Sequence, residues 1–296
     1  MSTESFAAVA QEITALTGTA CASAPERSIG GGSINHCYYW RAGSSAMFVK
    51  LAASASQPAF AAEADGLREL RRARALRVPE VLATGIAGST AFLALEWIEP
   101  GAADDACERR LGEGLAALHS VTVARYGWWR DNTIGRTPQA NDWSEDWVEF
   151  FRERRLRPQL ALAARHGLAA QLAGPGERLL AALPALLAGH APRGSLLHGD
   201  LWGGNWLSSA AGEPVLVDPA VYYGDRETDL AMTRLFGGFG AAFYRAYQSA
   251  APLPAGAALR AQLYNLYHVL NHANLFGGGH ARQARDLIER LLAAAA

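Results

Sequence analysis

The chain has 296 residues, of which 50% are hydrophobic and 19% are charged, and its formal net charge is −1. This length and composition suffice for a protein of two modest lobes with a sizeable core, and the near-neutral charge does not favour nucleic acid as a partner. No segment is long and apolar enough to predict a membrane span, and the first residues lack the basic segment and apolar core of a secretory signal.

The first part of the chain alternates helical and extended patterns. Residues 1–18 carry apolar side chains at helical spacing and predict a helix. Residues 24–51 are rich in β-branched and aromatic residues and are interrupted by the turns GGGS and AGSS, which predicts three antiparallel strands. In the third strand, AMFVKL, Lys50 should face away from Met47 and Val49, because side chains alternate along a strand.

A second helix is predicted from Pro58 to residue 76, and two more strands are predicted at 78–85 and 91–101. The Pro-Gly step in the last of these strands ends the sheet. We therefore place a domain boundary after residue 99.

Beyond this boundary the pattern is mostly helical. Helices are predicted at 107–121, 143–167 and 174–190 and through the C-terminal third. Only WLSS (206–209) and PVLVD (214–218) look extended.

This order of elements predicts an α+β fold with two lobes. The first lobe, residues 1–99, is a small antiparallel sheet with one helix packed on it. The second lobe, residues 100–296, is larger and mostly helical.

A Gly-rich turn, GGGSIN, lies between the first two predicted strands. Backbone N–H groups without side chains in the way can approach phosphate oxygens closely. No Gly-Lys-Ser/Thr follows, so the turn is not a P-loop, and a strand follows it where a dinucleotide-binding fingerprint requires a helix. The alternative is a flexible hairpin turn without a ligand. The residues that would cover phosphates are Gly30, Gly31, Gly32 and Ser33.

Lys50 stands in an otherwise apolar strand, and Glu63 lies on the helix that follows. An ion pair with Glu63, combined with a contact to a polyphosphate, would satisfy the ammonium group. The alternative is an edge-strand lysine that extends to water.

The stretch HGDLWGGNWL contains Asp200 and, after four intervening residues, Asn205. This is the spacing of a kinase catalytic loop, in which the Asp meets the attacking hydroxyl and the Asn holds metal. Asp218 ends the strand PVLVD, and an Asp and an Asn together offer the hard oxygen ligands that Mg²⁺ selects. Each feature alone is weak, but their order along the chain predicts a kinase-like phosphotransferase.

Longer segments carry a resemblance to a known family. HGDLWGGN is similar to the motif of aminoglycoside- and choline-kinase-like phosphotransferases. The chain resembles more narrowly the fructosamine kinases, also called ketosamine 3-kinases, and nearly its whole length takes part. The segments that carry this resemblance are YGWWRDNTIGRTPQANDW (126–143), WVEFFRERRLRPQL (147–160), DPAVYYGDRETDLAMTRLFGGF (218–239) and YNLYHVLNHANLFGGG (264–279).

The resemblance implies a protein-kinase-like fold and an enzyme that uses ATP and Mg²⁺. A cytoplasmic location is expected from the small number of cysteines. The acceptor of this enzyme would be a ketoamine, such as a ribulosamine, erythrulosamine or fructosamine, on a small amine or on glycated protein lysines. Phosphorylation at the third sugar carbon makes such an adduct labile and frees the amine. A monomer or weak dimer is expected. One departure is His280, where the family pattern has an aromatic residue after FGGG.

The resemblance also assigns expected roles. Lys50, held by Glu63, contacts the α- and β-phosphates, and Asp200 orients the acceptor hydroxyl and takes its proton. Mg²⁺ is expected on Asn205 and Asp218. The backbone of the connector meets the adenine through Glu96, Trp97 and Ile98. The acceptor candidates offer aromatic faces for sugar C–H surfaces and polar groups for hydroxyls and an amine; they are Trp202, Asp131, Asn132, Gln139, Asn141, Asp225 and His272.

Other polar residues have structural explanations. His198 should shape the catalytic loop through backbone hydrogen bonds, and Asp229 should cap a helix or brace that loop. The segment RERRLR is expected to be a solvated helix face. His268 and His272 have metal-ligand spacing, but no third ligand follows, which disfavours zinc.

Three cysteines, Cys21, Cys37 and Cys107, are too few for a disulfide framework and fit a reduced compartment. If Cys37 is exposed beside the Gly-rich turn, its oxidation would affect activity or link two chains. Two alternatives to the ketoamine kinase stay open: a related small-molecule kinase for an aminoglycoside or choline-type alcohol, and a kinase-like module that binds nucleotide without catalysis.

Overall fold

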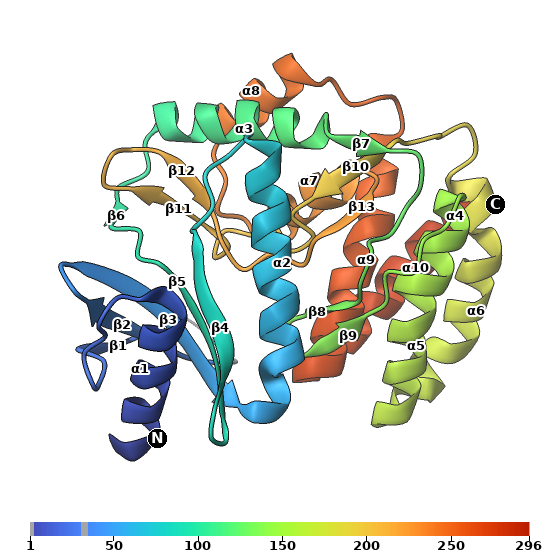
Figure 1. Ribbon diagram of the computed structural model, residues 1–296. Helices are drawn as coiled ribbons and strands as arrows, with labels where there is room; N and C mark the ends of the chain where they lie inside the picture. The colour runs from blue at the N-terminus through green and yellow to red at the C-terminus, as the bar shows by residue number, and fades with distance from the viewer. Residues whose placement is uncertain (1–2, 31–34, 296) are drawn as a thin grey trace. The chain divides into compact units, whose positions relative to one another are not determined.

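The structure is a computed structural model that describes residues 3–30 and 35–295 (Figure 1). The chain divides into two compact units, one made of residues 1–107 and 206–219 and the other of residues 108–205 and 220–296. The predicted Gly31, Gly32 and Ser33 lie outside the described residues.

The first unit contains an antiparallel five-stranded sheet in the order β1-β2-β3-β5-β4. Its helix α1 and helix α2 occupy the positions predicted for them, apart from a few residues at their ends. The elements are α1 (Thr3–Thr17), β1 (Arg27–Ile29), β2 (His36–Ala42), β3 (Ser45–Ala53), η1 (Ser54–Ser56), α2 (Gln57–Ala73), β4 (Val81–Ala87) and β5 (Thr90–Glu96).

One face of this sheet forms the core of the unit. Met47, Val49 and Leu51 of β3 pack in one buried cluster with Val9 and Ile13 of α1. Strand alternation places Lys50 on the opposite face, as predicted, and there it meets Glu63 of α2.

The first unit also takes in a segment far along the sequence. Strand β6 (Pro100–Gly101) pairs with β11 (Trp206–Ser209), which pairs in turn with β12 (Pro214–Leu216). Leu216 N–H also donates to Arg77 O at 3.0 Å. These pairings extend the unit past the predicted boundary at residue 99 and add the hairpin to it.

The second unit is mostly helical, and in Figure 1 helices α5, α6, α9 and α10 lie side by side. A three-stranded sheet in the order β13-β10-β7 and a hairpin β8-β9 complete it. The elements are α3 (Asp105–His119, which begins in the first unit), β7 (Thr122–Val123), β8 (Asn132–Ile134), β9 (Thr137–Gln139), α4 (Trp147–Phe150), η2 (Phe151–Leu156), α5 (Arg157–Ala163), η3 (Ala164–Leu168), α6 (Ala169–Leu186), β10 (Gly194–Leu197), β13 (Tyr222–Gly224), α7 (Glu227–Leu235), α8 (Ala241–Ala250), α9 (Ala257–Phe276) and α10 (His280–Ala295).

The expectation that only two segments beyond the predicted strand at 91–101 are extended was wrong, because β7, β8, β9, β10 and β13 are strands as well. Each has two to four residues, too few to show an alternating pattern. Strands β7, β10 and β13 form through pairing with partners distant in the sequence, whereas β8 and β9 pair with each other across a short turn. The α+β fold with a sheet lobe and a helical lobe is confirmed. Among residues 3–30 and 35–295, no helix combines the length and the apolar character needed to cross a membrane.

Candidate functional site

Lys50 is the centre of a charged triad in the first unit. The residue is only 3% exposed, and its Nζ lies 2.8 Å from Glu63 Oε1 and 2.7 Å from Asp218 Oδ1. Burial alone would lower the pKa of Lys50, but the two carboxylates, by charge and by hydrogen bonds, outweigh burial and raise that pKa. Lys50 is therefore a permanent cation, which a phosphate-binding group requires.

Asp218 follows β12 in an unusual backbone conformation. Its φ is 54°, in the left-handed region that few residues other than glycine adopt. Such backbone strain is found most often at functional sites. The side chain is 47% exposed although one oxygen holds Lys50, so Asp218 is accessible to a ligand.

Residues 96–98, at the end of β5 and just after it, form the connector expected to meet the adenine. Some of its polar groups already have partners within the first unit. Glu96 N–H donates to Glu80 O at 2.8 Å, and the Glu96 carboxylate pairs with Arg77 at 2.7 Å. The N–H and the carboxylate of Glu96 therefore have partners within the unit, and the adenine contact of the Glu96, Trp97 and Ile98 backbone stays a prediction. Gly30 directly follows β1, which is where the predicted phosphate-covering turn begins.

Cys37 of β2 is opposite Lys50 in the strand register. It is buried, and burial raises the pKa of its thiol. The structure therefore contradicts the exposure on which the redox hypothesis for Cys37 depended.

The second unit holds the loop that is predicted to be catalytic, and this loop follows β10. Asn205 Nδ2 donates to Asp200 O at 2.8 Å and to Asp200 Oδ2 at 3.1 Å. The loop is tight because Trp202 N–H donates to Asp200 O and Asn205 N–H donates to Trp202 O. Asp200 and Asn205 are therefore in direct contact, and Asp200 orients the side-chain amide of Asn205.

A buried carboxylate braces this loop. Asp229 accepts the backbone N–H of His198 at 2.8 Å and that of Gly199 at 2.9 Å. His119 Nε2 lies 3.2 Å from the same carboxylate. Burial alone would raise the pKa of Asp229, but the contact with His119, the charge of His198 and the backbone N–H of Gly199 outweigh burial and lower that pKa. The brace predicted for Asp229 is confirmed.

His198 shapes the loop from inside, as predicted. Its ring is fully buried, and Asp200 N–H donates to His198 Nδ1 at 3.3 Å. Gly199 has a φ of 84°, and a Cβ there would overlap the carbonyl of Ala220. Only glycine fits between His198 and Asp200.

Three of the predicted acceptor residues are buried amides that bind one another and the backbone. Asn141 Nδ2 donates to Asn132 Oδ1 at 3.0 Å, and Gln139 Nε2 donates to the same oxygen at 2.8 Å. Asn132 Nδ2 donates to Val221 O at 2.8 Å. These groups hold the chain in place, and direct contact with an acceptor stays a prediction for the more exposed candidates.

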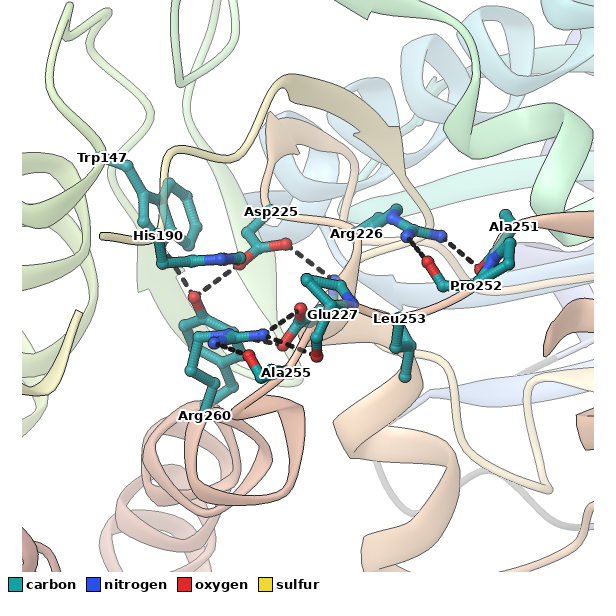
Figure 2. A network of polar contacts seen from close by, with 12 residues as sticks. Trp147, His190, Asp225, Arg226, Glu227, Ala251, Pro252, Leu253, Ala255 and Arg260 are labelled. Carbon is teal, nitrogen blue, oxygen red and sulfur yellow. Dashed lines mark hydrogen bonds and ion pairs between the residues drawn. The ribbon is translucent and has the colours of Figure 1, made fainter. Parts of the chain in front are cut away.

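Asp225, another acceptor candidate, is the centre of the buried network in Figure 2. His190 Nε2 lies 2.6 Å from Asp225 Oδ2. Tyr264 donates its hydroxyl hydrogen to the same oxygen at 2.6 Å. Glu227 beside it binds Arg260 through both carboxylate oxygens. His190, Asp225 and Glu227 place ligand atoms within 4.8 Å of one another, but Tyr264 and Arg260 already satisfy both carboxylates, so the cluster is structural.

Among the less buried acceptor candidates, the exposed Trp202 and the half-buried His272 belong to one row of rings. Trp202 is 39% exposed, and its ring centroid lies 6.5 Å from that of Phe236. Phe236 lies 4.6 Å from the ring of His272. Asp131, the third less buried candidate, accepts Asn141 N–H at 2.8 Å. Two candidates far apart in sequence are thus joined by Phe236, which the sequence patterns did not single out.

Arg155 is the other residue that sequence patterns missed. The expectation that RERRLR is a solvated helix face was wrong at this position, because Arg155 is 0% exposed. The signal was present in the spacing, since Trp147, Phe151 and Arg155 recur every four residues on one helical face. An arginine in line with two buried aromatic residues belongs to the interior.

Comparisons with known proteins agree with this geometry. The family model described as fructosamine kinase matches residues 5–294. A protein named "probable ketoamine kinase" from Synechocystis sp. is 45% identical over 285 residues, which is 96% of each chain. A chloroplastic "protein-ribulosamine 3-kinase" from Oryza sativa subsp. japonica is 39% identical over 272 residues, 90% of this chain and 78% of the relative.

A solved structure supports the fold independently. The crystal structure of a "putative fructosamine-3-kinase" from Haemophilus somnus 129PT has a TM-score of 0.88 and 28% sequence identity, and the match covers 96% of each chain. The family match spans almost all of both units, including the Lys50 triad and the Asp200 loop. The chain belongs to the fructosamine kinase family.

Proposed function

We propose that this protein transfers the γ-phosphoryl group of ATP to a sugar hydroxyl of a ketoamine, at the third carbon, and so promotes deglycation. The observation that carries the proposal is the buried Lys50, which binds both Glu63 and Asp218. A buried cation with two oriented carboxylates is the arrangement that phosphoryl transfer uses. The family match and the names of the relatives support the ketoamine as acceptor.

Lys50 has a donor available for phosphate. An ammonium group has three N–H donors, and Glu63 and Asp218 account for two of them. The third contacts an α- or β-phosphate oxygen. Glu63 keeps the ammonium in place when the phosphates compete with Asp218 for it.

The residues present fit a magnesium ion. Asn205 points its Nδ2 at Asp200, so its Oδ1, the atom that a hard cation takes, is directed away from Asp200. Asp218 adds a carboxylate that is 47% exposed. Bound Mg²⁺ would neutralise phosphate charge, and Asn205 and Asp218 would hold it.

Asp200 carries the proton transfer. Its carboxylate accepts the proton of the attacking hydroxyl, and Asn205 and the loop backbone orient it. A positioned general base contributes roughly 10²- to 10⁴-fold to the rate. Trp202, Asp131 and His272 are the candidates for contact with the sugar and the amine, because an aromatic face packs on sugar C–H groups and a carboxylate pairs with a protonated amine.

A substrate panel tests the proposal. Purified protein with Mg-ATP is assayed with ribulosamine, erythrulosamine and fructosamine derivatives, with an aminoglycoside and with choline, and the phosphorylated carbon is located by NMR. Turnover restricted to the ketoamines, with phosphate on the third carbon, is the expected result, and Asp200→Asn should abolish most of it while ATP still binds. Turnover of the aminoglycoside or choline alone would refute the acceptor class. ATP binding without turnover of any acceptor would indicate a binding module.

A further inference from the structure

Arg155 is a fully buried cation, and none of its hydrogen bonds among residues 3–30 and 35–295 is to a carboxylate. Its side chain lies in the π-helical turn η2, and within the part of the chain that the structure describes no carboxylate forms an ion pair with it. Its NH1 donates to Ala140 O at 2.7 Å, and its NH2 donates to Asn141 Oδ1 at 2.8 Å. The guanidinium carbon lies 4.0 Å from the ring centroid of Tyr222.

This arrangement is costly for stability. Burial of an arginine is usually offset by a carboxylate, whereas here carbonyl oxygens and aromatic faces compensate the charge only partly. The Arg155 Nε, moreover, has no hydrogen-bond partner among the described residues. A costly group in the interior suggests a role beyond packing.

Arg155 determines the direction of a chain of amide hydrogen bonds. A guanidinium only donates, so Asn141 must turn its oxygen toward Arg155 and its Nδ2 away. That Nδ2 donates to Asn132 Oδ1, and Asn132 Nδ2 donates to Val221 O. We call this chain of hydrogen bonds, from Arg155 through Asn141 and Asn132 to Val221 O, the relay. In each of its bonds the donor is on the side of Arg155, and hydrogen bonds aligned in this way strengthen one another.

A second chain of hydrogen bonds, which begins at Tyr267, ends at the Ala220 carbonyl next to Val221. The Tyr267 hydroxyl donates to Gln139 Oε1 at 2.7 Å, which turns Gln139 Nε2 toward Ala220 O at 3.2 Å and toward Asn132 Oδ1. Burial raises the pKa of Tyr267, and the charge of Arg155 opposes this rise while that of Asp200 adds to it. The Ala220–Val221 segment is thus held by two amides whose orientation is set from the interior.

The Ala220–Val221 segment lies against the catalytic loop. Ala220 N–H donates to His198 O at 2.9 Å, and the carbonyl of Ala220 leaves no room for a side chain at Gly199. Tyr222, which lies against Arg155, pairs with Leu197 just before the loop. Two routes therefore connect Arg155 to the residues that precede Asp200.

We infer that Arg155 is a positioning residue for the catalytic base Asp200, acting through the Asn141–Asn132 relay and the Ala220–Val221 segment. The inference rests on the proposed function, because it assigns Arg155 to the acceptor step of phosphoryl transfer. It predicts that loss of the guanidinium misplaces the loop without changing the groups that bind ATP.

The first test compares Arg155→Met with Arg154→Met. Methionine keeps most of the buried length of Arg155 but removes the charge and the donors. Arg154 is the neighbouring residue in the same turn, and its side chain is 38% exposed and pairs with Asp142. Because small errors in alignment are costly for the rate, R155M should lower kcat for a ketoamine by about 10- to 100-fold with little change in the KM for ATP. R154M should keep both values.

A double-mutant cycle separates positioning from general stability. If Arg155 acts through Asp200, the rate of R155M/D200N should equal that of D200N alone, because no base remains to be positioned. Rates are measured well below the unfolding temperature of each variant, with folded protein verified by circular dichroism. A further loss of about 10-fold or more in the double variant would overturn the inference.

Asn141→Asp provides a second, independent variant. Aspartate still accepts the hydrogen bond from Arg155 but cannot donate to Asn132, so the relay is broken while the cation is satisfied. A lower kcat in N141D with unchanged KM for ATP supports the inference even if R155M does not fold. Wild-type kcat in N141D or in folded R155M contradicts it. A wild-type protein that turns over no ketoamine would instead refute the proposed function, so the two failures are distinguishable.

Discussion

Lys50 Nζ and Asp218 Oδ1 lie 2.7 Å apart, although the two residues are separated by 168 positions in the chain. The pairing exists because the β11–β12 hairpin belongs to the same unit as the five-stranded sheet. It joins the proposed phosphate-binding cation to a proposed metal ligand, and the first two predictions concern these two residues.

Lys50→Met should raise the KM for ATP by at least about 10-fold, the equivalent of about 1.4 kcal/mol of binding. The change removes the phosphate contact and leaves Glu63 and Asp218 without their cation. Steady-state kinetics with varied ATP measures the effect. Arg68→Met, which removes an exposed i,i+3 ion pair on α2, is the control, and equal ATP kinetics in the two variants would contradict the role of Lys50.

Asp218→Asn should raise the Mg²⁺ concentration for half-maximal activity by at least about 10-fold, as changes at metal sites usually do. Asparagine tolerates the left-handed backbone of this position, so the variant tests the charge and not the fold. Magnesium titrations of the initial rate provide the measurement. Glu213→Gln, on the same hairpin but paired with Arg77, should behave as wild type, and an unchanged titration in Asp218→Asn would exclude Asp218 as a ligand.

Asp229→Asn should lower the free energy of unfolding by about 1–3 kcal/mol and reduce kcat as well. The two carboxylate oxygens accept from different backbone N–H groups, those of His198 and Gly199, and an amide would present a donor to one of them. Urea unfolding and steady-state kinetics check the two effects. Asp142→Asn, at a carboxylate that is 72% exposed, serves as the control. A stable variant with normal kcat would show that the brace is dispensable.

His268 should make the protein less stable in mild acid. Burial, aided by the charge of His272 and opposed by Asp229, lowers the pKa of His268 from 6.5 to about 3. Between these values the unfolded chain binds a proton at His268 that the native protein does not, so the free energy of unfolding falls as the pH falls through this window.

One bound proton corresponds to about 1.4 kcal/mol per pH unit, and the unfolded His268 is nearly fully protonated one unit below its ordinary pKa, so stability should drop by close to that amount between about pH 5.5 and pH 4.5 through His268 alone. Urea unfolding at several pH values measures the slope. His268→Gln should flatten it, and His166→Gln, at an exposed histidine, should leave it unchanged. Identical slopes for wild type and His268→Gln would refute the assignment.

The elements with strong local patterns were predictable from the sequence. Helix α1, the three strands up to Ala53 and helix α2 follow from periodicity and turn residues, because neighbouring residues decide them. The contact between Asp200 and Asn205 was predictable for the same reason, since a short loop forces residues at that spacing together. The side of β3 on which Lys50 lies follows from strand alternation alone.

The burial of polar side chains depended on tertiary structure. Asn132, Gln139, Asn141 and Asp225 look like acceptor contacts in the sequence, and Arg155 looks solvated, yet all five are buried. Burial depends on which distant elements pack against a residue, and a polar side chain looks the same in sequence whether it binds a ligand or its own backbone.

The sequence by itself determined the residues on which the proposed chemistry rests: a strand lysine, a helix glutamate, and a loop in which local geometry fixes the spacing of Asp200 and Asn205. Only the tertiary structure decided which of the other polar groups support that loop from within. The physical reason is that spacing is a property of the chain, whereas the satisfaction of a buried donor or acceptor is a property of the packed core.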